Sequence, residues 1–499
     1  MSRVVVIGAG MGGLAVAARL ATLGHDVTVC EQAPTIGGKL GTFSRDGFTF
    51  DTGPSLLTLP AVYRDLFIKT GRPLEDDLEI LSIDPAFRYR FAEGVDNTND
   101  ATWLTVPGTS RAGIKRAFDE TLGPGTGTAW ERLLDRAESI WQVTRTPFLE
   151  SPLDGRRDLV RLARRTRDIR TVAPWRSLRG LGRQYLRDPR QRMLLERYAT
   201  YTGSDPRRVP AALAVIPYVE QTFGAWHVRG GMRRLALAVH DRAVERGARV
   251  RTGSDVAEVV VEGGRASGVR LASGERIAAD VVVSDADASH LYADLVRTPL
   301  AAPAVSRLRR AEPSLSGFVL MLALRDRTAD LAHHTVLFPR DYDAELDAVF
   351  GPGAHPPSDP TVYISAPDDP SLRPDDRHEA WFVLVNAPRH GPVDWDEPGL
   401  AAAYADRILA VLAERGMDVR DRVLWREIRT PADLERDTRA PGGAIYGSSS
   451  NGASAAFLRP ANRSPVPGLF LVGGSAHPGG GLPLVGLSAA IVAGLVGPA

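Results

Sequence analysis

Two short apolar runs near the start of the chain are separated by a segment with a helical repeat. Residues 4–7 and 27–30 are each long enough for a buried strand, and residues 14–21 place apolar side chains at helical spacing. A buried strand, a helix and a second buried strand form a βαβ unit with two parallel strands. The pattern therefore predicts that the chain opens with a Rossmann-type fold.

The turn between the first strand and the helix contains Gly8, Gly10, Gly12 and Gly13 around Met11. In a dinucleotide-binding turn, one glycine permits the tight turn, one lets the backbone approach a pyrophosphate, and one allows close packing of helix and strand. The helix N-terminus adds unpaired N–H groups and a positive dipole end. We therefore predict that the turn binds the phosphates of a dinucleotide, with a ligand-free glycine turn as the alternative.

An acid and a second glycine pair extend this predicted site. Glu31 ends the second strand, eighteen residues after Gly13, where a carboxylate can accept hydrogen bonds from a ribose. Gly37, Gly38 and Lys39 begin six residues later. A longer cofactor would reach these residues, so the spacing favours FAD over NAD.

A second glycine-rich turn lies near the end of the chain. An apolar strand-like run leads through Gly473 and Gly474 into residues 475–481, and the apolar residues 482–496 follow. The N-terminus of a helix can stabilise a reduced, anionic flavin ring. We predict that this turn lies at the ring end of the cofactor, with a purely structural turn as the alternative.

The middle of the chain mixes helical and strand-like patterns. Residues 111–220 are helical and broken by prolines, residues 255–261 and 268–271 resemble the two strands of a hairpin, and residues 318–385 are rich in β-like pieces. Residues 482–496 are shorter than the roughly 20 apolar residues that a bilayer span needs. We expect them to form a buried helix. The glycine-rich start also argues against a signal peptide.

Composition and charge narrow the function classes. With 43% hydrophobic residues, the 499-residue chain can form a sizeable core. The 61 basic and 60 acidic residues nearly cancel, which removes nucleic acid as a default partner. Cys30 is the only cysteine, so an internal disulfide and a cysteine metal cluster are excluded. We expect a cytoplasmic protein without a metal site.

Several motifs together resemble one family. Besides the first glycine turn, they are residues 51–54 (DTGP), 284–287 (SDAD) and 477–481 (HPGGG). In this order they resemble the bacterial-type phytoene desaturase family of carotenoid desaturases, FAD enzymes of the amine oxidase-like group. Residues 333–335 (HHT), 359–363 (DPTVY) and 458–463 (LRPANR) extend the resemblance over nearly the whole chain.

Two departures bear on the substrate. The family more often has Asn where Asp285 stands, and HPGAGVPG where residues 477–484 read HPGGGLPL. The second form looks more like members that act on later carotenoids, including 3,4-desaturases of 1-hydroxycarotenoids. The resemblance leaves open whether the acyclic substrate is phytoene or a later, 1-hydroxylated intermediate.

The resemblance implies an FAD enzyme that introduces C=C bonds by hydride transfer to flavin, with oxygen or a quinone as the final electron acceptor. A cation left by hydride loss is delocalised along the polyene, so a strong protein base is not required. The predicted cofactor-binding residues are Gly8, Gly10, Met11, Gly12, Gly13, Glu31, Gly38, Lys39, Gly53, Pro54, Val256, Gly473, Gly474, Gly480, Gly481 and Leu482.

Three further polar residues are weighed for the predicted site. His477 could act as a catalytic base, or it could hold the following glycine turn or the cofactor. Arg229 could line a substrate channel or pair with a carboxylate. Asp285 reads as a turn-forming aspartate.

The predicted fold is α/β, with a Rossmann-type FAD-binding domain interleaved with a mixed-sheet substrate domain and a helical, membrane-facing cap. Residues 1–75, 226–296 and 437–499 would form the FAD-binding domain. Residues 76–108 and 297–436 would form the substrate domain, and residues 109–225 the cap.

An arginine-rich segment suggests where a membrane could be met. Residues 156–197 hold fourteen arginines, three aspartates and one glutamate, interleaved with apolar side chains. Such a surface suits an anionic bilayer, and the acids are too few for much internal pairing. A solvated, salt-bridged helix or a nucleic-acid patch is the alternative. We expect peripheral contact with the inner face of the cell membrane, which would give access to a long apolar substrate.

Two other functions compete with desaturation. A carotenoid isomerase or another amine oxidase-like flavin oxidoreductase would use the same cofactor, although amine substrates usually require an aromatic or acidic anchor that the sequence does not reveal. GDP-dissociation inhibitors share the fold and bind lipidated GTPases without catalysis. Flavin motifs at both ends of the chain argue against that alternative.

Overall fold

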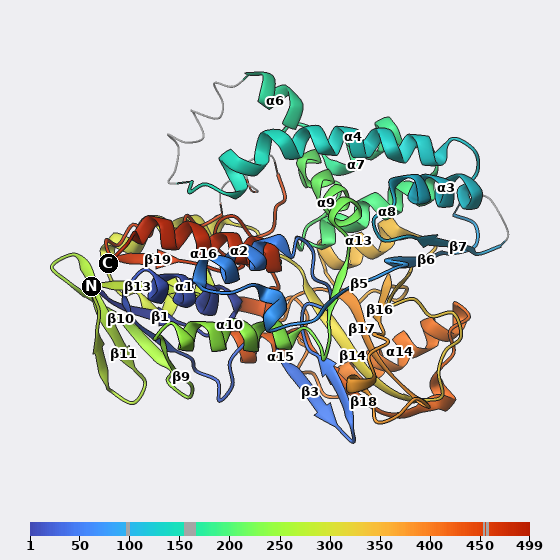
Figure 1. Ribbon diagram of the computed structural model, residues 1–499. Helices are drawn as coiled ribbons and strands as arrows, with labels where there is room; N and C mark the ends of the chain where they lie inside the picture. The colour runs from blue at the N-terminus through green and yellow to red at the C-terminus, as the bar shows by residue number, and fades with distance from the viewer. Residues whose placement is uncertain (96–99, 154–165, 453–454, 456–458) are drawn as a thin grey trace.

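The computed structural model describes residues 1–95, 100–153, 166–452, 455 and 459–499, and it has a mixed α/β fold. Figure 1 shows a first part that holds both termini and is called the nucleotide-binding part after the prediction made for it, a second part built on a larger sheet, and a helical layer above that sheet. Segments far apart in the sequence meet in the first part, because its central sheet takes strands from both ends and from the middle of the chain.

The central sheet of the nucleotide-binding part has five parallel strands. Their spatial order is β19 (Leu469–Leu471), β13 (Val281–Ser284), β1 (Arg3–Ile7), β2 (Asp26–Cys30) and β9 (Arg249–Arg251). Because both faces of such a sheet are covered, its central strands β1 and β13 are nearly continuous apolar runs, as the pattern of residues 4–7 predicted.

Each face of this sheet has its own apolar core. Val4 and Val6 point towards α1 (Met11–Thr22), which packs against α10 (Arg233–Glu245) and α16 (Leu482–Val496). Val5 and Ile7 point to the opposite core.

That opposite core lies beneath a small antiparallel sheet. Its strands are β10 (Val256–Glu262), β11 (Arg265–Leu271) and β12 (Arg276–Ala278). The predicted hairpin is confirmed, with its second strand beginning three residues earlier than the apolar pattern indicated.

The second part is built on a seven-stranded sheet. Its spatial order is β18 (Val423–Arg429), β14 (Ser316–Arg325), β17 (His378–Ala387), β16 (Val362–Ser365), β15 (His334–Leu337), β6 (Phe87–Phe91) and β7 (Thr102–Val106). All neighbours are antiparallel except the pair β15 and β6. On one face of β14 the core includes α14 (Leu400–Glu414), and on the other it includes Phe48 and Phe50.

Two small antiparallel sheets of two strands each connect the parts. The hairpin of β3 (Thr42–Arg45) and β4 (Phe48–Asp51) leaves the nucleotide-binding part and packs its phenylalanines against the larger sheet. In the second sheet, β5 (Ile80–Ser82) pairs with β8 (Trp226–Val228). This sheet joins the segments that precede and follow the helical layer in the sequence.

The helical layer follows β7 and covers the end of the larger sheet (Figure 1). Serine and aspartate side chains accept hydrogen bonds at helix N-termini, as Ser110 does from the Gly113 N–H. Its helices are α3 (Arg111–Leu122), α4 (Thr126–Thr144), α6 (Thr166–Val172), α7 (Leu178–Tyr185), α8 (Pro189–Thr200) and α9 (Val215–Phe223). This agrees with the helical pattern predicted for residues 111–220.

Further α-helices complete the part of the fold that the structure describes. They are α2 (Ala61–Thr70), α11 (Ala288–His290), α12 (Ala302–Arg310), α13 (Tyr342–Phe350) and α15 (Pro431–Thr438). The expected helix at residues 482–496 is confirmed as α16, which packs against α1 and α2. Within the described residues, no helix is both long and apolar enough to cross a bilayer.

Candidate functional site

The first glycine turn joins β1 to α1 and is packed so closely that side chains are excluded. A Cβ atom on Gly13 would overlap the carbonyl oxygen of Gly8, and one on Gly12 would lie 2.9 Å from the Cα atom of Gly473. Gly8 has φ +93°, a left-handed conformation that glycine adopts without strain. The predicted roles of Gly8 and Gly13 are therefore visible in the geometry.

Glu31 lies at the end of β2 and faces this turn. Its carboxylate accepts hydrogen bonds from the backbone N–H of Ala9 at 2.6 Å and of Ala33 at 2.8 Å. Only 7% of the residue is exposed. A carboxylate held beside a glycine turn fits the ribose-binding position predicted for Glu31.

Asp285 is a residue of the turn whose importance the sequence analysis missed. It follows β13, its carboxylate oxygens lie against Gly10, Gly12 and Gly473, and it accepts a hydrogen bond from the Gly13 N–H. Burial raises the pKa of Asp285 to about 7, with Glu31 adding repulsion. The side chain is thus more than a turn former, because it occupies the N-terminus of α1 where phosphates are predicted.

From this position of Asp285 we predict that the affinity for FAD depends on pH. In the free protein the Asp285 carboxyl is neutral below about pH 7 and anionic above it, where it would repel a phosphate. FAD affinity should therefore fall as the pH rises from 7 to 9, by up to about tenfold per pH unit. The Asp285→Asn protein should show a flat profile in FAD titrations of the apoprotein. Parallel profiles for the two proteins would contradict this assignment.

The second glycine turn follows β19 and is bonded to Arg459, which also bonds to a neighbouring loop that Lys39 contacts. Arg459 Nη1 donates hydrogen bonds to the carbonyl oxygens of Tyr446 at 2.7 Å and of Gly474 at 3.1 Å. Lys39 Nζ donates to the carbonyl oxygen of Ile445 at 2.6 Å. Burial lowers the pKa of Arg459 to about 10 and also lowers the pKa of Lys39.

The predicted residues Lys39 and Gly53 lie together near this turn. A Cβ on Gly53 would overlap the carbonyl oxygen of Lys39, and Lys39 bonds to the loop that carries Tyr446. A Cβ on Gly480 would lie 2.5 Å from the Tyr446 ring. Residues from both ends of the chain therefore share one region, and its close backbone contacts fit a cofactor that spans both glycine turns.

His477 is held by the segment between α4 and α6. Its Nε2 atom lies 3.0 Å from the carbonyl oxygen of Ser151, and its ring meets the Phe148 ring edge-on. Burial lowers the pKa of His477 to about 4 despite backbone hydrogen bonds from this segment that raise it, so the ring is neutral. These contacts join His477 to the segment after α4 and not to the following glycine turn, so the holding and the catalytic roles weighed for it both stay predictions.

Arg229 forms an ion pair and Val256 packs in an apolar core, and the roles predicted for both at the site stay predictions. Arg229 is half-exposed and forms a two-point ion pair with Glu79, with Nη2 2.9 Å from Oε1. That is the carboxylate pairing considered for it. Val256 begins β10 and is buried in the apolar core with Val5 and Ile7.

A buried polar cluster lies between β8 and the larger sheet. The imidazole rings of His227 and His333 are 5.0 Å apart, and those of His333 and His334 are 4.4 Å apart. His227 Nε2 lies 3.0 Å from a carboxylate oxygen of Asp369. Sequence reasoning saw His333 and His334 only as part of a motif, because their partners come from other segments.

Aromatic and cationic side chains continue this cluster towards the helical layer. Tyr363 OH lies 2.8 Å from His334 Nδ1 and 2.7 Å from Ser55 Oγ. Arg197 stacks its guanidinium on the rings of Tyr201 and Tyr363, at 4.9 and 5.5 Å from their centroids. The aromatic surroundings that the sequence did not reveal are therefore present next to Ser55, which directly follows the predicted cofactor residue Pro54.

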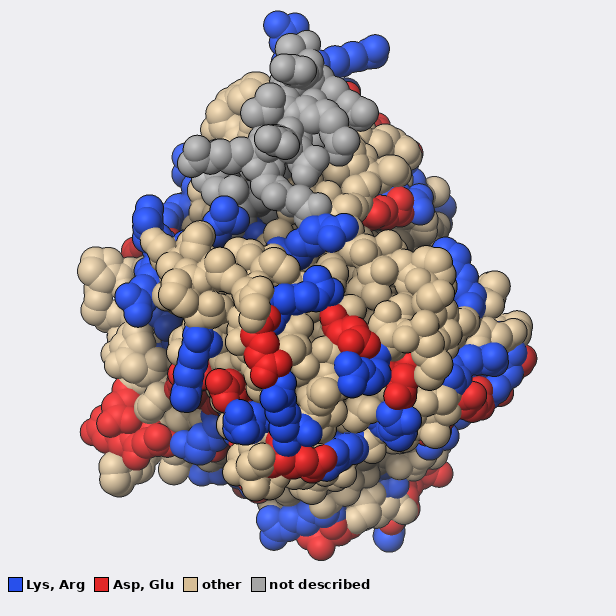
Figure 2. Space-filling view, turned by 90° about the vertical axis from the view of Figure 1, so that its left-hand side faces the viewer, with Lys and Arg blue, Asp and Glu red and all other residues tan. Residues whose placement is uncertain are grey.

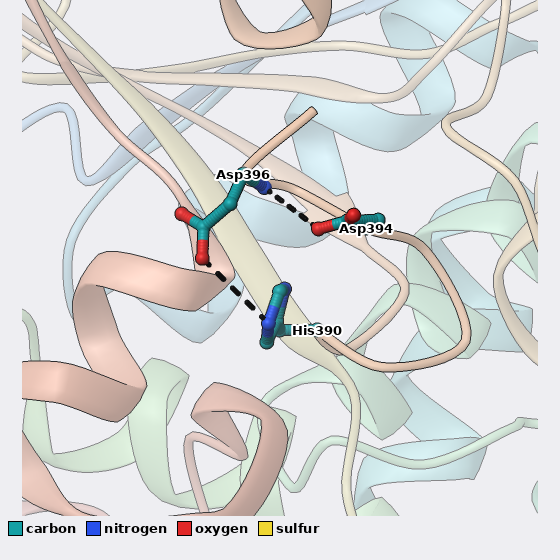
Figure 3. A group of neighbouring side chains, drawn as sticks. All are labelled: His390, Asp394 and Asp396. Atoms are coloured by element: carbon teal, nitrogen blue, oxygen red, sulfur yellow. Dashed lines mark hydrogen bonds and ion pairs between the residues drawn. The ribbon is translucent and has the colours of Figure 1, made fainter. Parts of the chain in front are cut away.

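One group of side chains has metal-like spacing but carries no metal assignment. The ligand atoms of His390, Asp394 and Asp396 lie within 4.8 Å of one another on the loop after β17 (Figure 3). Asp396 already pairs with Arg436 at 2.9 Å, and an oxygen of Asp394 accepts the Asp396 N–H. The carboxylates thus serve the loop and a neighbouring cation.

Comparisons with known proteins agree with this geometry. Residues 11–496 match the family described as flavin containing amine oxidoreductase. The chain is 35% identical to a 4,4'-diapolycopene oxygenase from Methylomonas sp., over 98% of this chain and 97% of that protein. It is 34% identical to a hydroxyneurosporene desaturase from Rubrivivax gelatinosus, over 98% and 92%.

A solved structure shares the fold. An oxidoreductase from Methanosarcina mazei superimposes with a TM-score of 0.66 at 17% identity, covering 98% of this chain and 99% of that one. At this identity the likeness concerns the fold alone.

Proposed function

The chain belongs to the flavin-containing amine oxidoreductase family, and on that premise we propose that it is an FAD-dependent desaturase of an acyclic carotenoid. The carrying observation is the 34% identity to a hydroxyneurosporene desaturase over nearly the full length of both chains. The two glycine turns and Glu31 fit the dinucleotide that such an enzyme needs. Membership of an oxidoreductase family also disfavours a non-catalytic carrier of lipidated proteins.

Desaturation removes a hydride and a proton from neighbouring carbons, and FAD when bound supplies the two-electron acceptor. The protein's part is to hold the polyene, to exclude water and to keep charges away from the forming cation. Neutral His477 and the partly buried apolar side chains Leu56, Leu59 and Leu149 suit that task. Oxygen or a quinone would remove the electrons afterwards.

Expression in pigment-producing cells tests this function. Cells that accumulate phytoene and cells that accumulate a 1-hydroxylated acyclic carotenoid would each receive the gene, and pigment spectra would be compared. A red shift with phytoene indicates an early desaturase, and a shift only with the hydroxylated pigment indicates a late one. Unchanged spectra in both strains, despite bound FAD, would reject the proposal.

Oxygenation is the second candidate function. It is favoured by one observation, the 35% identity to a 4,4'-diapolycopene oxygenase over nearly the whole chain. A carotenoid isomerase, or a flavin enzyme acting on another substrate, remains the alternative if neither hydrogen loss nor oxygen gain occurs. The mass of the product separates these reactions.

We also propose that the protein is cytoplasmic and touches the inner face of the cell membrane through the arginine-rich segment. The described, exposed members of this surface are Arg167, Arg170, Arg176, Arg183, Arg187 and Trp175, and 67% of Trp175 is exposed. In Figure 2 basic side chains extend from the upper end of the molecule, and acidic ones are more numerous in the lower half. Basic groups beside an exposed tryptophan favour an anionic bilayer.

Part of the sequence argument for this surface is corrected by the structure. Arg179 pairs with Glu196 at 2.6 Å and with Asp343, Arg190 pairs with Asp188, and Arg197 is buried. The inference that acids are too few for internal pairing is therefore wrong for Arg179 and Arg190. It counted Asp188 and Glu196 but not the pairing that they make, and it missed Asp343 of α13. The arginines at 156, 157, 161, 164 and 165 lie outside the described residues.

Replacing Arg167, Arg170 and Arg176 by glutamine should weaken binding to anionic vesicles by about 100-fold, since each basic residue near the surface contributes about 1 kcal/mol. Co-sedimentation with vesicles of anionic and of neutral lipid measures the effect. The matched control changes three exposed arginines elsewhere, Arg309, Arg377 and Arg420. An equal loss in both variants would reduce the effect to net charge and overturn the proposed surface.

A further inference from the structure

Three histidines next to the predicted cofactor region hold buried nitrogen atoms without a hydrogen-bond partner among the described residues. The atoms are His227 Nδ1, His333 Nε2 and His334 Nε2. His334 is fully buried and His227 is 4% exposed. An unpaired buried polar atom is costly, and three in one cluster of touching rings indicate a small polar group that the protein binds there.

The protonation of the cluster limits what that group can be. Although burial acts to raise it, hydrogen bonds from Ser371, Gly230 and His227 hold the pKa of Asp369 well below its usual value. The Asp369 carboxylate therefore accepts the His227 Nε2–H, which leaves the lone pair of Nδ1 free as an acceptor when the ring is neutral. The carboxylate orients His227, and its two oxygens also accept hydrogen bonds from the backbone N–H groups of Gly230 and Ser371.

The rings of His333 and His334 are neutral. Burial, with repulsion from His227, lowers the pKa of His333 to about 3, and burial lowers the pKa of His334 well below its usual value. A neutral imidazole has one donor and one acceptor. Together the rings suit a neutral group that both donates and accepts, which is the property of a hydroxyl and not of a carboxylate or an ammonium group.

The cluster is connected to the segment that carries the predicted cofactor residues Gly53 and Pro54. His334 is joined through Tyr363 OH to Ser55, which follows the predicted cofactor residues Gly53 and Pro54. The backbone of Leu57 pairs with that of Trp226, the neighbour of His227. Two separate connections therefore link the histidines to the segment that follows Gly53 and Pro54.

We infer that His227, His333 and His334 form a binding site for the hydroxyl group of an acyclic carotenoid hydroxylated at one end. The inference rests on the proposed function and names the substrate class within it. One imidazole N–H donates to the hydroxyl oxygen, and the hydroxyl donates to the lone pair of a second imidazole. The site thereby selects a hydroxylated polyene and places the carbons near that end beside the cofactor.

Binding of a matched substrate pair tests this site without relying on turnover. Quenching of protein fluorescence would give the Kd of the holoprotein for hydroxyneurosporene and for neurosporene, which lacks the hydroxyl. The intact protein should bind the hydroxylated pigment at least about tenfold more tightly. The visible flavin spectrum checks that each variant is folded.

Three variants test whether the histidine cluster causes the preference for the hydroxylated pigment. His333→Phe keeps the size of the ring and removes its nitrogens, so the ratio of the two Kd values should fall towards one. His333→Gln returns a polar group near the Nε2 position and should restore part of the ratio. His355→Phe changes an exposed histidine outside the cluster and should keep the ratio.

Equal affinities of the intact protein for the two pigments, or an equal loss for both in His333→Phe, would overturn the inference and leave the cluster as a site for water alone. Selective binding without desaturation of either pigment would instead contradict the proposed function while supporting the hydroxyl site. The two failures are thus distinguishable.

Discussion

The Gly13→Ala protein is expected to purify without bound flavin. The added methyl group would overlap the carbonyl oxygen of Gly8, which is backbone and cannot rotate away. The β1–α1 turn must therefore open, and the N–H groups at the start of α1 lose the arrangement that binds phosphates. Absorbance near the flavin bands, relative to protein absorbance, measures the loss.

The matched control is Gly494→Ala in α16. A Cβ atom there meets no atom within 4 Å, so the substitution should leave flavin content unchanged. Full flavin occupancy in the Gly13→Ala protein would show that the turn does not carry the cofactor site assigned to it.

Replacing Asn462 by leucine should lower the free energy of unfolding by about 2–3 kcal/mol. Its fully buried amide nitrogen lies within hydrogen-bond distance of the carbonyl oxygens of Leu471 and His477 and of Ser488 Oγ, at 3.0, 2.8 and 3.1 Å. These acceptors belong to β19, the second glycine turn and α16. Denaturant titration of the apoprotein measures the change, and faster flavin release should accompany it.

Ser488→Ala is the graded comparison for this variant. It removes one acceptor and leaves the asparagine with the two carbonyl groups, so its cost should be about 1 kcal/mol. If both variants were as stable as the unchanged protein, the hydrogen bonds of Asn462 would not hold the second turn together.

Local patterns were sufficient for much of the fold. The strand, glycine turn and helix at residues 4–21 and the hairpin at residues 255–271 each depend on neighbours in sequence, and each forms as predicted. Likewise the apolar run at residues 482–496 forms a helix as predicted, and this helix packs against α1.

Features that depend on long-range contacts could not be predicted in this way. Asp285 looks like any aspartate after a strand until the fold places its carboxylate against Gly10, Gly12 and Gly473. The partnership of Asp369 with His227 joins residues 142 positions apart. Residue type gave no signal for either, although an acid directly after a buried strand could have been tested as a site residue.

In the arginine-rich segment, too, long-range contacts could not be predicted from the sequence. Counting acids within residues 156–197 missed Asp343, which lies on α13 and pairs with Arg179. The count also included Arg197, which stacks on Tyr201 and Tyr363 inside the protein. Charge counts over a segment describe its surface only where the side chains remain outside.

The most direct test of the central claim is the mass of the product formed from hydroxyneurosporene by purified, FAD-loaded protein with a quinone and without oxygen. Our account predicts a carotenoid that is lighter by two hydrogen atoms and shifted to longer wavelength. A product that requires oxygen and gains an oxygen atom would identify an oxygenase, and a product of unchanged mass would identify an isomerase. Either outcome would contradict desaturation.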